Sequence, residues 1–330
     1  MADGSGILVI GEFVDGELAS STLEALAAGR ALLNSLPGER LSIMLAGAHV
    51  SDASDTAIAH GADIVYVVAD STLAHPAPEA IVAAAAAAAT EAAPRAIIGS
   101  KTILGREVMP RLAFRLGTAL AQDCTALAID DSKRLLATRP TYGGNAVATV
   151  ACLSMPSVAA IRVKSVDAGE PDGSRHGQLV PLSIDLSDAV RVRSVERVDQ
   201  AADGIRLEDA RVIVSGGRGL GGPDAFEQLE QLATLMGGAV GASRAACDAG
   251  WVPSSYQVGL TGKTVTPELY IAVAISGASQ HMAGCSNART IVAINKDTGA
   301  NIFKSARFGV AGDWQKVLPA FVEQVHELLG

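Results

Sequence analysis

The stretch RVIVSGGRGLGG, residues 211–222, runs from a short apolar strand directly into a glycine-rich turn. Gly217, Gly219 and Gly222 have the G-x-G-x-x-G spacing of a dinucleotide-binding loop, in which backbone amides after a strand meet a pyrophosphate. The spacing alone is a weak signal, because the chain contains 34 glycines. The stretch predicts an α/β domain, and it leaves open whether the turn binds a nucleotide or only connects a strand to a helix.

Composition limits the classes of protein to which the chain can belong. Its 330 residues are enough for two domains, and a hydrophobic share of 49% with 4% aromatics is typical of α/β proteins. The 26 basic residues against 35 acidic ones argue against a general affinity for nucleic acid or anionic membrane. The chain enters the apolar run ILVIGEF without a secretory signal, and its longest apolar run is about half a membrane span. We expect a cytoplasmic protein without membrane insertion.

Four cysteines, Cys124, Cys152, Cys247 and Cys285, are widely separated in the sequence. They form no C-x-x-C pair and have no histidine cluster nearby, so we expect no metal site. Isolated thiols of this kind fit a reducing compartment.

Strands and helices alternate through the first part of the chain. Short apolar runs at residues 7–13, 41–47, 63–69 and 95–100 predict buried strands, with helical segments between them and a further helix at 105–122. After residue 123 the short runs at 124–131, 134–142, 146–152 and 157–163 predict an antiparallel extension of the first sheet or a hairpin-rich edge on it.

A polar, irregular connector separates this part from a second strand–helix series. The second series predicts strands at 211–217, 238–243, 269–275 and 290–295, and helices at 223–236, from Ser276 and from Asp313. We predict a scaffold and partner-docking domain at 1–190, a linker at 191–207 and a nucleotide-binding domain at 208–330. Each domain is expected to hold a mainly parallel sheet flanked by helices.

The second strand of the later domain tests the dinucleotide interpretation. A Rossmann unit places Asp or Glu there to hold a ribose hydroxyl, but this strand ends on Ser243 and Arg244. Arginine at that position can bind a 2′-phosphate, so an NADP-dependent oxidoreductase using the SGGRGLGG turn and Arg244 stays open. A nucleotide-binding scaffold without redox activity is a third possibility.

A more specific signal lies in AISGASQH, residues 274–281. A buried strand ends there, and Ser276 is predicted at the N-cap of a helix whose first amides attract an anion. Gly277 would allow a phosphate to approach the backbone, with Gln280 and His281 about one turn later.

Several long motifs together carry a family resemblance over nearly the whole chain. SGGRGL, ASRAACDAGWVP, QVGLTGK, LYIAVAISGASQH and AINKD, in this order and spacing, resemble the C-terminal FAD domain of the electron-transfer flavoprotein large (alpha) subunit. The upstream ILVIGE, GSKTILGREVMPRLAFRLGTAL and ATRPTYGGNAVATV resemble the N-terminal domain of the same subunit. The resemblance implies a Rossmann-like FAD-binding second domain. The upstream GSKTILGREV is interpreted as structural.

The resemblance also implies which residues contact FAD. The matching positions are Arg218, Ser243, Arg244, Gln257, Val258, Gly259, Leu260, Thr261, Ser276, Gly277, Ala278, Ser279, Gln280, His281, Asn295, Asp313 and Trp314. Ser276, Gly277, Arg218 and Asn295 are expected near the phosphate–ribose portion, and Asp313 at the adenosine end. A cationic or donating His281, with Arg244 beside the ring and Thr261 near flavin N5, would stabilise the one-electron-reduced flavin.

The implied function is electron carriage, without a catalytic residue acting on a substrate of its own. The resemblance implies a heterodimer with a beta subunit that usually holds AMP, or a second FAD in bifurcating members. Donors would be dehydrogenases such as the acyl-CoA dehydrogenases of fatty acid oxidation, and the acceptor a quinone reductase or other carrier.

Three positions depart from the family pattern. Leu260 replaces a usual glutamine, Arg307 a usual acidic residue and Cys285 a usual methionine. We expect the first two to affect flavin potential or the partner surface, and Cys285 to serve packing.

Overall fold

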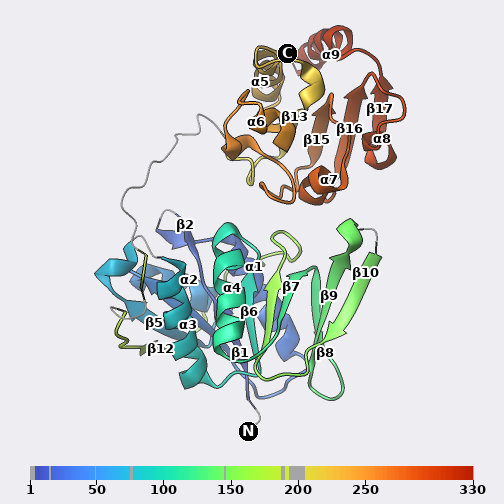
Figure 1. Cartoon of the computed structure of the whole chain (residues 1–330). Coiled ribbons are helices and arrows are strands. Elements are labelled where there is room, and N and C mark those ends of the chain that lie inside the picture. Colours follow the sequence, from blue (N-terminus) through green and yellow to red (C-terminus); the bar gives the residue numbers. More distant parts are fainter. Residues whose placement is uncertain are drawn as a thin grey trace. The chain divides into compact units, whose positions relative to one another are not determined.

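The computed structural model describes residues 4–14, 16–48, 50–74, 77–144, 146–186, 190–192 and 205–329. The chain divides into two compact units, Met1–Val198 and Asp199–Gly330, each with its own sheet (Figure 1). The division falls within the stretch 191–207 that the sequence predicts as a linker. Most of that stretch lies outside the described residues, so the linker stays a prediction.

The larger sheet of the first unit is parallel, with the strand order β12-β5-β4-β1-β6-β11-β7. Its strands are β1 (Ile7–Ile10), β4 (Leu41–Gly47), β5 (Ile64–Ala69), β6 (Ala96–Ser100), β7 (Leu120–Cys124), β11 (Ser157–Ile161) and β12 (Gln178–Pro181). β1, β4 and β6 are buried along their whole length, because helices cover both faces of the sheet. The alternation of strands and helices predicted for this part is confirmed.

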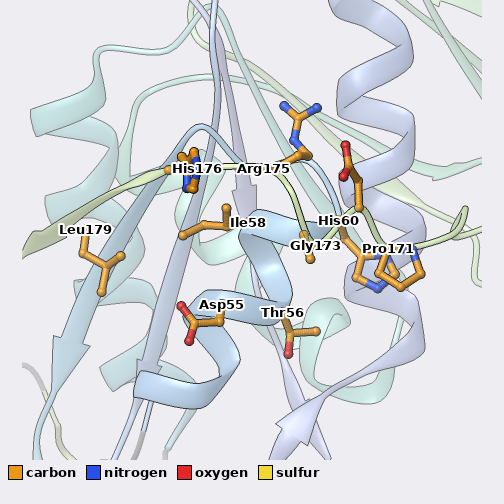
Figure 2. Close-up of a pocket in the computed structure, with 12 residues that line it drawn as sticks. Asp55, Thr56, Ile58, His60, Pro171, Gly173, Arg175, His176 and Leu179 are labelled. Carbon is orange, nitrogen blue, oxygen red and sulfur yellow. The ribbon is translucent and has the colours of Figure 1, made fainter.

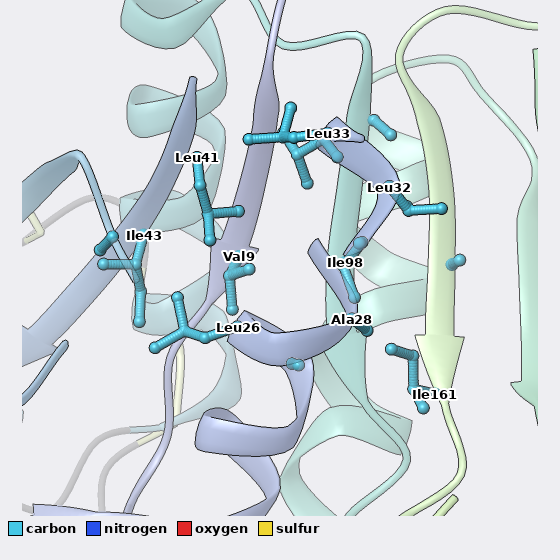
Figure 3. Close-up of a cluster of buried hydrophobic side chains, with 14 of the residues drawn as sticks. Val9, Leu26, Ala28, Leu32, Leu33, Leu41, Ile43, Ile98 and Ile161 are labelled. Carbon is cyan, nitrogen blue, oxygen red and sulfur yellow. The ribbon is translucent and has the colours of Figure 1, made fainter. Parts of the chain in front are cut away.

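The helices of the first unit are α1 (Ser20–Leu33), α2 (Ser51–Ala59), α3 (Pro78–Ala92) and α4 (Ile103–Arg115), with short 3₁₀ turns at Ser71–Ala74 and Tyr142–Gly144. A small hairpin joins β2 (Phe13–Val14) to β3 (Glu17–Leu18). Figure 3 shows Leu26 and Leu32 of α1 among Val9, Ile43 and Ile98 of the sheet. This apolar layer holds α1 against the strands on one face.

The antiparallel pairing predicted after residue 123 is confirmed for three strands, but their predicted place on the first sheet is wrong. β8 (Ala126–Ile129), β9 (Leu135–Thr141) and β10 (Ala146–Ala151) form a separate antiparallel sheet. β10 is an edge strand, and its Val147 is 68% exposed. The last predicted member of the extension is wrong, because Ser157–Ile161 lies in the large sheet and pairs parallel with β6 and β7.

Two boundaries around α4 also differ from the prediction. The helix ends at Arg115, and Gly117 with φ +67° turns the chain into β7, so the predicted helix at 105–122 is too long. At the other end, Thr102 caps the helix by accepting a hydrogen bond from the Gly105 amide (2.8 Å). Thr102 also donates to the Glu12 carboxylate, and a Cβ at Gly105 would lie 1.8 Å from the Ser100 carbonyl oxygen. Packing therefore explains the GSKTILGREV motif.

The second unit holds a parallel sheet with the order β14-β13-β15-β16-β17. Its strands are β13 (Val212–Gly216), β14 (Ala239–Ala242), β15 (Leu269–Val273), β16 (Thr290–Asn295) and β17 (Phe308–Ala311). Its helices are α5 (Ala225–Leu235), α6 (Arg244–Asp248), α7 (Ser279–Cys285), α8 (Ile302–Ser305) and α9 (Trp314–Leu329), with 3₁₀ turns at Arg218–Leu220 and Ser254–Tyr256. After β14 the chain crosses to the other side of β13, so the sheet reverses its winding direction between β13 and β15. Doubly wound sheets bind ligands at the carboxyl ends of the strands at such a point.

Two features of this unit were not predicted. The helix expected from Ser276 begins at Ser279, because Gly277 has φ +79° and Ala278 occupies the N-cap position in an extended conformation. Strand β17 was missed because its side chains are all exposed and provide no alternating pattern. The predicted strand–helix class of both units is confirmed. No helix in the described part of the chain is both long and apolar enough to cross a membrane.

Candidate functional site

A cavity of about 690 Å³ lies in the second unit, where the parallel strands end. Its walls come from the turns after β13, β14, β15 and β16 and from the loop at residues 257–261. This volume is within the usual range of cofactor sites. The cavity therefore lies at the position that the winding of the sheet predicts for a ligand.

The structure brings most of the predicted site residues together around this cavity. Those that line it are Arg218, Ser243, Arg244, Gln257, Val258, Gly259, Leu260, Thr261, Ser276, Ala278, Gln280, His281 and Asn295. Among the described residues, Gly277, Ser279, Asp313 and Trp314 were predicted but are not part of its lining. Contact with FAD stays a prediction for both groups.

The glycine-rich turn after β13 has a packing explanation. A Cβ at Gly217 would lie 2.1 Å from the Ala274 carbonyl oxygen, and one at Gly219 would lie 3.0 Å from the same atom. A Cβ at Gly222 would meet no atom within 4 Å, although the third glycine of a dinucleotide fingerprint serves close packing of helix on strand. The glycines at 217 and 219 allow the turns after β13 and β15 to touch.

Ser243 and Arg244 follow β14. The Ser243 hydroxyl is buried and has no hydrogen-bond partner among the described residues. Arg244 is exposed and pairs with Asp248 one helical turn later (Nε–Oδ2 3.2 Å). An exposed pair of this kind contributes little to stability, so the guanidinium can exchange Asp248 for a ligand at small cost.

The loop at residues 257–261 forms the neighbouring part of the wall, where the Val258 amide donates to the Ala242 carbonyl at the end of β14 (2.9 Å). The Gln257 side-chain amide donates to the Thr261 hydroxyl (2.9 Å), which keeps its own proton for a further partner. The Leu260 amide donates to the Gln280 carbonyl (2.7 Å). Gly259 has φ +147°, and a Cβ at this position would lie 2.9 Å from the same carbonyl oxygen. These contacts fix the loop against the start of α7. Leu260 lines the cavity with 47% of its surface exposed.

The segment between β15 and α7 differs from its predicted role. Ser276 lines the cavity but is not an N-cap, since the helix starts three residues later. A Cβ at Gly277 would lie 2.2 Å from the Ile302 backbone nitrogen. Close packing against α8 therefore explains the glycine, whereas the sequence pattern assigned it to the approach of a phosphate.

His281 is the most buried ionisable group of the lining, with 7% of its surface exposed. Its Nε2 is 2.9 Å from the Tyr270 hydroxyl, and its Nδ1 has no hydrogen-bond partner in the described structure. Burial lowers the pKa of His281 to about 4, against a smaller contribution from the Val258 backbone that raises it. Of the two predicted forms, burial favours the uncharged donor, and the role of His281 toward FAD stays a prediction.

Asn295 and Asp297 close the cavity beyond β16. The Asn295 side chain donates to the Ile275 carbonyl (2.9 Å) and accepts from the Asp297 amide (3.0 Å), so much of its hydrogen-bonding capacity already joins two strand ends. Sequence reasoning missed two lining carboxylates, Asp248 and Asp297. The i,i+4 spacing from Arg244 could have indicated Asp248, and the position just after a predicted strand could have indicated Asp297.

Asp313 and Trp314 lie at the start of α9. The Asp313 carboxylate accepts a hydrogen bond from the Gln315 amide (3.1 Å) and caps the helix. Trp314 is 9% exposed and belongs to the core under α5 and α9.

A second cavity, of about 640 Å³, lies in the first unit between α2 and the segment 171–179 (Figure 2). His60, His176 and Arg175 line it, together with Asp55 and Asp172. Arg175 is already paired with Asp63 outside the lining (Nη2–Oδ1 3.2 Å). Within the described residues no three metal-ligating side chains converge here or elsewhere.

Comparison with known proteins agrees with this geometry. The chain matches an electron transfer flavoprotein domain over residues 7–187 and an electron transfer flavoprotein FAD-binding domain over residues 206–286. Relatives that cover nearly the whole chain include proteins named electron transfer flavoprotein subunit alpha. The one from Thermoanaerobacterium thermosaccharolyticum is 42% identical over 99% of this chain and 100% of its own length. Those from Megasphaera elsdenii and Bacillus subtilis are 40% and 39% identical, covering 100% and 98% of this chain and 99% and 98% of their own lengths.

These matches also decide between the interpretations left open by the sequence. The FAD-binding match spans the SGGRGLGG turn and Arg244, which are the two features offered for an NADP-dependent oxidoreductase, so that alternative is not supported. The predicted resemblance is confirmed over nearly the whole chain. The chain belongs to the family of electron transfer flavoprotein alpha subunits.

Proposed function

We propose that this chain binds FAD in the cavity of its second unit and acts as the FAD-carrying subunit of a heterodimeric electron carrier. One observation carries the cofactor assignment. Two buried polar atoms of the lining, Ser243 Oγ and His281 Nδ1, have no partner in the described structure. Buried polar groups normally find a hydrogen bond, so a polar ligand is the natural partner for both. FAD, when bound, supplies an isoalloxazine ring that accepts and releases electrons singly.

Arg218 is the proposed partner of the diphosphate. It lines the cavity beside the carboxyl end of β13 and makes no ion pair among the described residues. A guanidinium matches phosphate oxygens with paired donors. Ser276 would add a hydroxyl donor from the turn after β15.

Arg244, Thr261 and His281 are the proposed partners of the ring. Thr261 retains a hydroxyl proton after accepting from Gln257, and the ion pair that Arg244 makes within the described residues is with the exposed carboxylate of Asp248. His281 would act as an uncharged donor. The positive charge near the ring would therefore come from Arg244.

The partner is proposed to be a beta subunit, because the relatives are named as alpha subunits of an electron transfer flavoprotein. That subunit would carry AMP or a second FAD. Dehydrogenases such as acyl-CoA dehydrogenases are the proposed donors, and a quinone reductase or another carrier is the proposed acceptor.

Co-purification with a beta subunit tests this function. The complex should show flavin absorbance that bleaches on reduction, and a colourless complex would contradict the proposal. Ser243→Ala should weaken FAD binding by about fivefold, since one buried hydrogen bond contributes about 1 kcal/mol. Ser286→Ala is the matched control, because Ser286 is exposed at the far end of α7. Equal flavin retention in the two variants would argue against Ser243 as a ligand.

A further inference from the structure

A buried pair of side chains lies beneath the cavity wall. Tyr270 of β15 is fully buried, and its hydroxyl is 2.9 Å from Nε2 of His281 in α7. The ring centroids are 6.0 Å apart, with the planes inclined by 53°. This geometry is a hydrogen bond between a phenol and one nitrogen of the imidazole.

The direction of this hydrogen bond follows from the protonation of the two groups. Burial lowers the pKa of His281 to about 4, so the ring is neutral near pH 7. Burial raises the pKa of Tyr270 well above its usual value, so the phenol keeps its proton. A neutral imidazole has one donor and one acceptor nitrogen, and its nitrogen is a better acceptor than the phenol oxygen. Tyr270 therefore donates to Nε2, and the imidazole proton resides on Nδ1.

The surroundings prevent Tyr270 from changing its position. It packs in an apolar cluster with Ile213 and Ala272, and Ser215 lies beside its hydroxyl. On the His281 side, the Cys285 thiol donates to the His281 carbonyl at 3.6 Å. Both partners of the hydrogen bond are thus held by the packed interior.

The other nitrogen of His281 is the one that remains available. Nδ1 is buried without a hydrogen-bond partner in the described structure, and His281 lines the cavity. Without Tyr270, Nε2 would lose the donor that holds it as the acceptor, so the proton would no longer be kept off Nε2.

We propose that Tyr270 is a positioning residue that keeps the proton of His281 on Nδ1, so that the ring offers the cavity an uncharged hydrogen-bond donor. The proposal rests on the proposed FAD site, where this donor would face an electron-rich oxygen of the flavin. It assigns Tyr270 a role through His281, without contact to the cofactor.

Nitrogen-15 NMR of the imidazoles tests the assignment. The full chain with its beta subunit is labelled at histidine and examined with FAD and after FAD removal, and His281→Gln identifies the His281 signal among the six histidines. The wild type should show the Nδ1–H tautomer. In Tyr270→Phe the Nδ1–H share should fall measurably, since Nε2 loses the donor that holds it as the acceptor.

Tyr66→Phe is the matched control, because it removes the phenol hydroxyl of a buried tyrosine that belongs to the first unit, whereas His281 belongs to the second. It should leave the His281 signal unchanged. An Nε2–H tautomer in the wild type, or an unchanged tautomer in Tyr270→Phe, would overturn the proposal. Should Tyr270→Phe fail to fold, the wild-type spectrum alone decides whether Tyr270 donates. The tautomer of His281 can be read from the FAD-free spectrum, so the role of Tyr270 is tested even if the chain does not bind FAD.

Discussion

Gly217 has no room for even one additional carbon. Its Cβ would lie 2.1 Å from the backbone oxygen of Ala274, a group that cannot rotate away. Gly217→Ala should therefore destabilise the second unit by about 1–3 kcal/mol, the usual cost of overpacking, and loosen the turn on which FAD is proposed to bind.

Urea unfolding followed by tryptophan fluorescence measures this change, because Trp251 and Trp314 both lie in the second unit. Gly222→Ala is the control, since its Cβ would meet no atom within 4 Å. Similar unfolding midpoints for the two variants would show that the contact with Ala274 relaxes easily.

Glu12 gives a residue-scale prediction about pH. Burial raises the pKa of Glu12 from 4.5 to about 7, although the hydrogen bond from Thr102 acts in the opposite direction. The folded protein thus binds this proton more tightly than the unfolded chain. The free energy of unfolding therefore decreases as pH rises from about 4.5 to 7, because the buried carboxylate loses its proton. Above pH 7 the total loss is about 3 kcal/mol.

Glu12→Gln should remove this cost, because glutamine stays neutral and still accepts from Thr102. The variant should exceed the wild type in stability at pH 8 by up to about 3 kcal/mol, with little difference near pH 4.5. Urea unfolding followed by circular dichroism at both pH values measures it. Glu17→Gln, at an exposed position, is the control. A stability difference independent of pH would contradict the assigned titration.

At the scale of elements, the start of α4 depends on one hydroxyl. Thr102 accepts from the Gly105 amide at 2.8 Å and donates to Glu12 Oε2 at 2.7 Å. Thr102→Ala should cost about 1–2 kcal/mol, because it removes the helix cap and the donor to Glu12. Thr102→Ser keeps the hydroxyl and should recover most of this loss in the same unfolding measurement. Equal losses in both variants would point to the threonine methyl group instead.

The elements also show what the sequence can predict. Strands such as β4 were predictable because both faces are buried and every residue is apolar or small. The direction of β11 was not, since it depends on where a distant segment returns to the sheet. The start of α7 was misplaced because Gly277 and Ala274 adopt positive φ, +79° and +54°, which hydrophobic periodicity does not report.

The candidate site was predictable where its residues follow strand ends, because parallel strands bring those ends together. The protonation of His281 was not predictable, because it depends on the packing of α7 over Tyr270. The family pattern also placed Gly277 among the site residues, but in the structure Gly277 packs against α8 and does not line the cavity. Local motifs thus locate the site, and tertiary contacts determine its chemistry.

At the scale of the whole molecule, the two units have separate cores and should respond differently to FAD. Free FAD at about 100 times its Kd should stabilise the unit that binds it by about 2.7 kcal/mol. Tryptophan fluorescence reports the second unit. Thiol labelling of Cys124, which is buried in the first unit, reports the other. Only the fluorescence transition should shift, and a matching shift in Cys124 labelling would show that the units unfold together.

The small sheet β8–β9–β10 has a consequence for handling the protein. Among the described residues, strand β10 pairs on one side only, with β9, and Val147 is exposed; unpaired strand edges of this kind can pair with strands of other molecules. Concentrated solutions of the chain alone should turn turbid through edge-to-edge stacking. A lysine in place of Val147 should keep them clear, as light scattering would record.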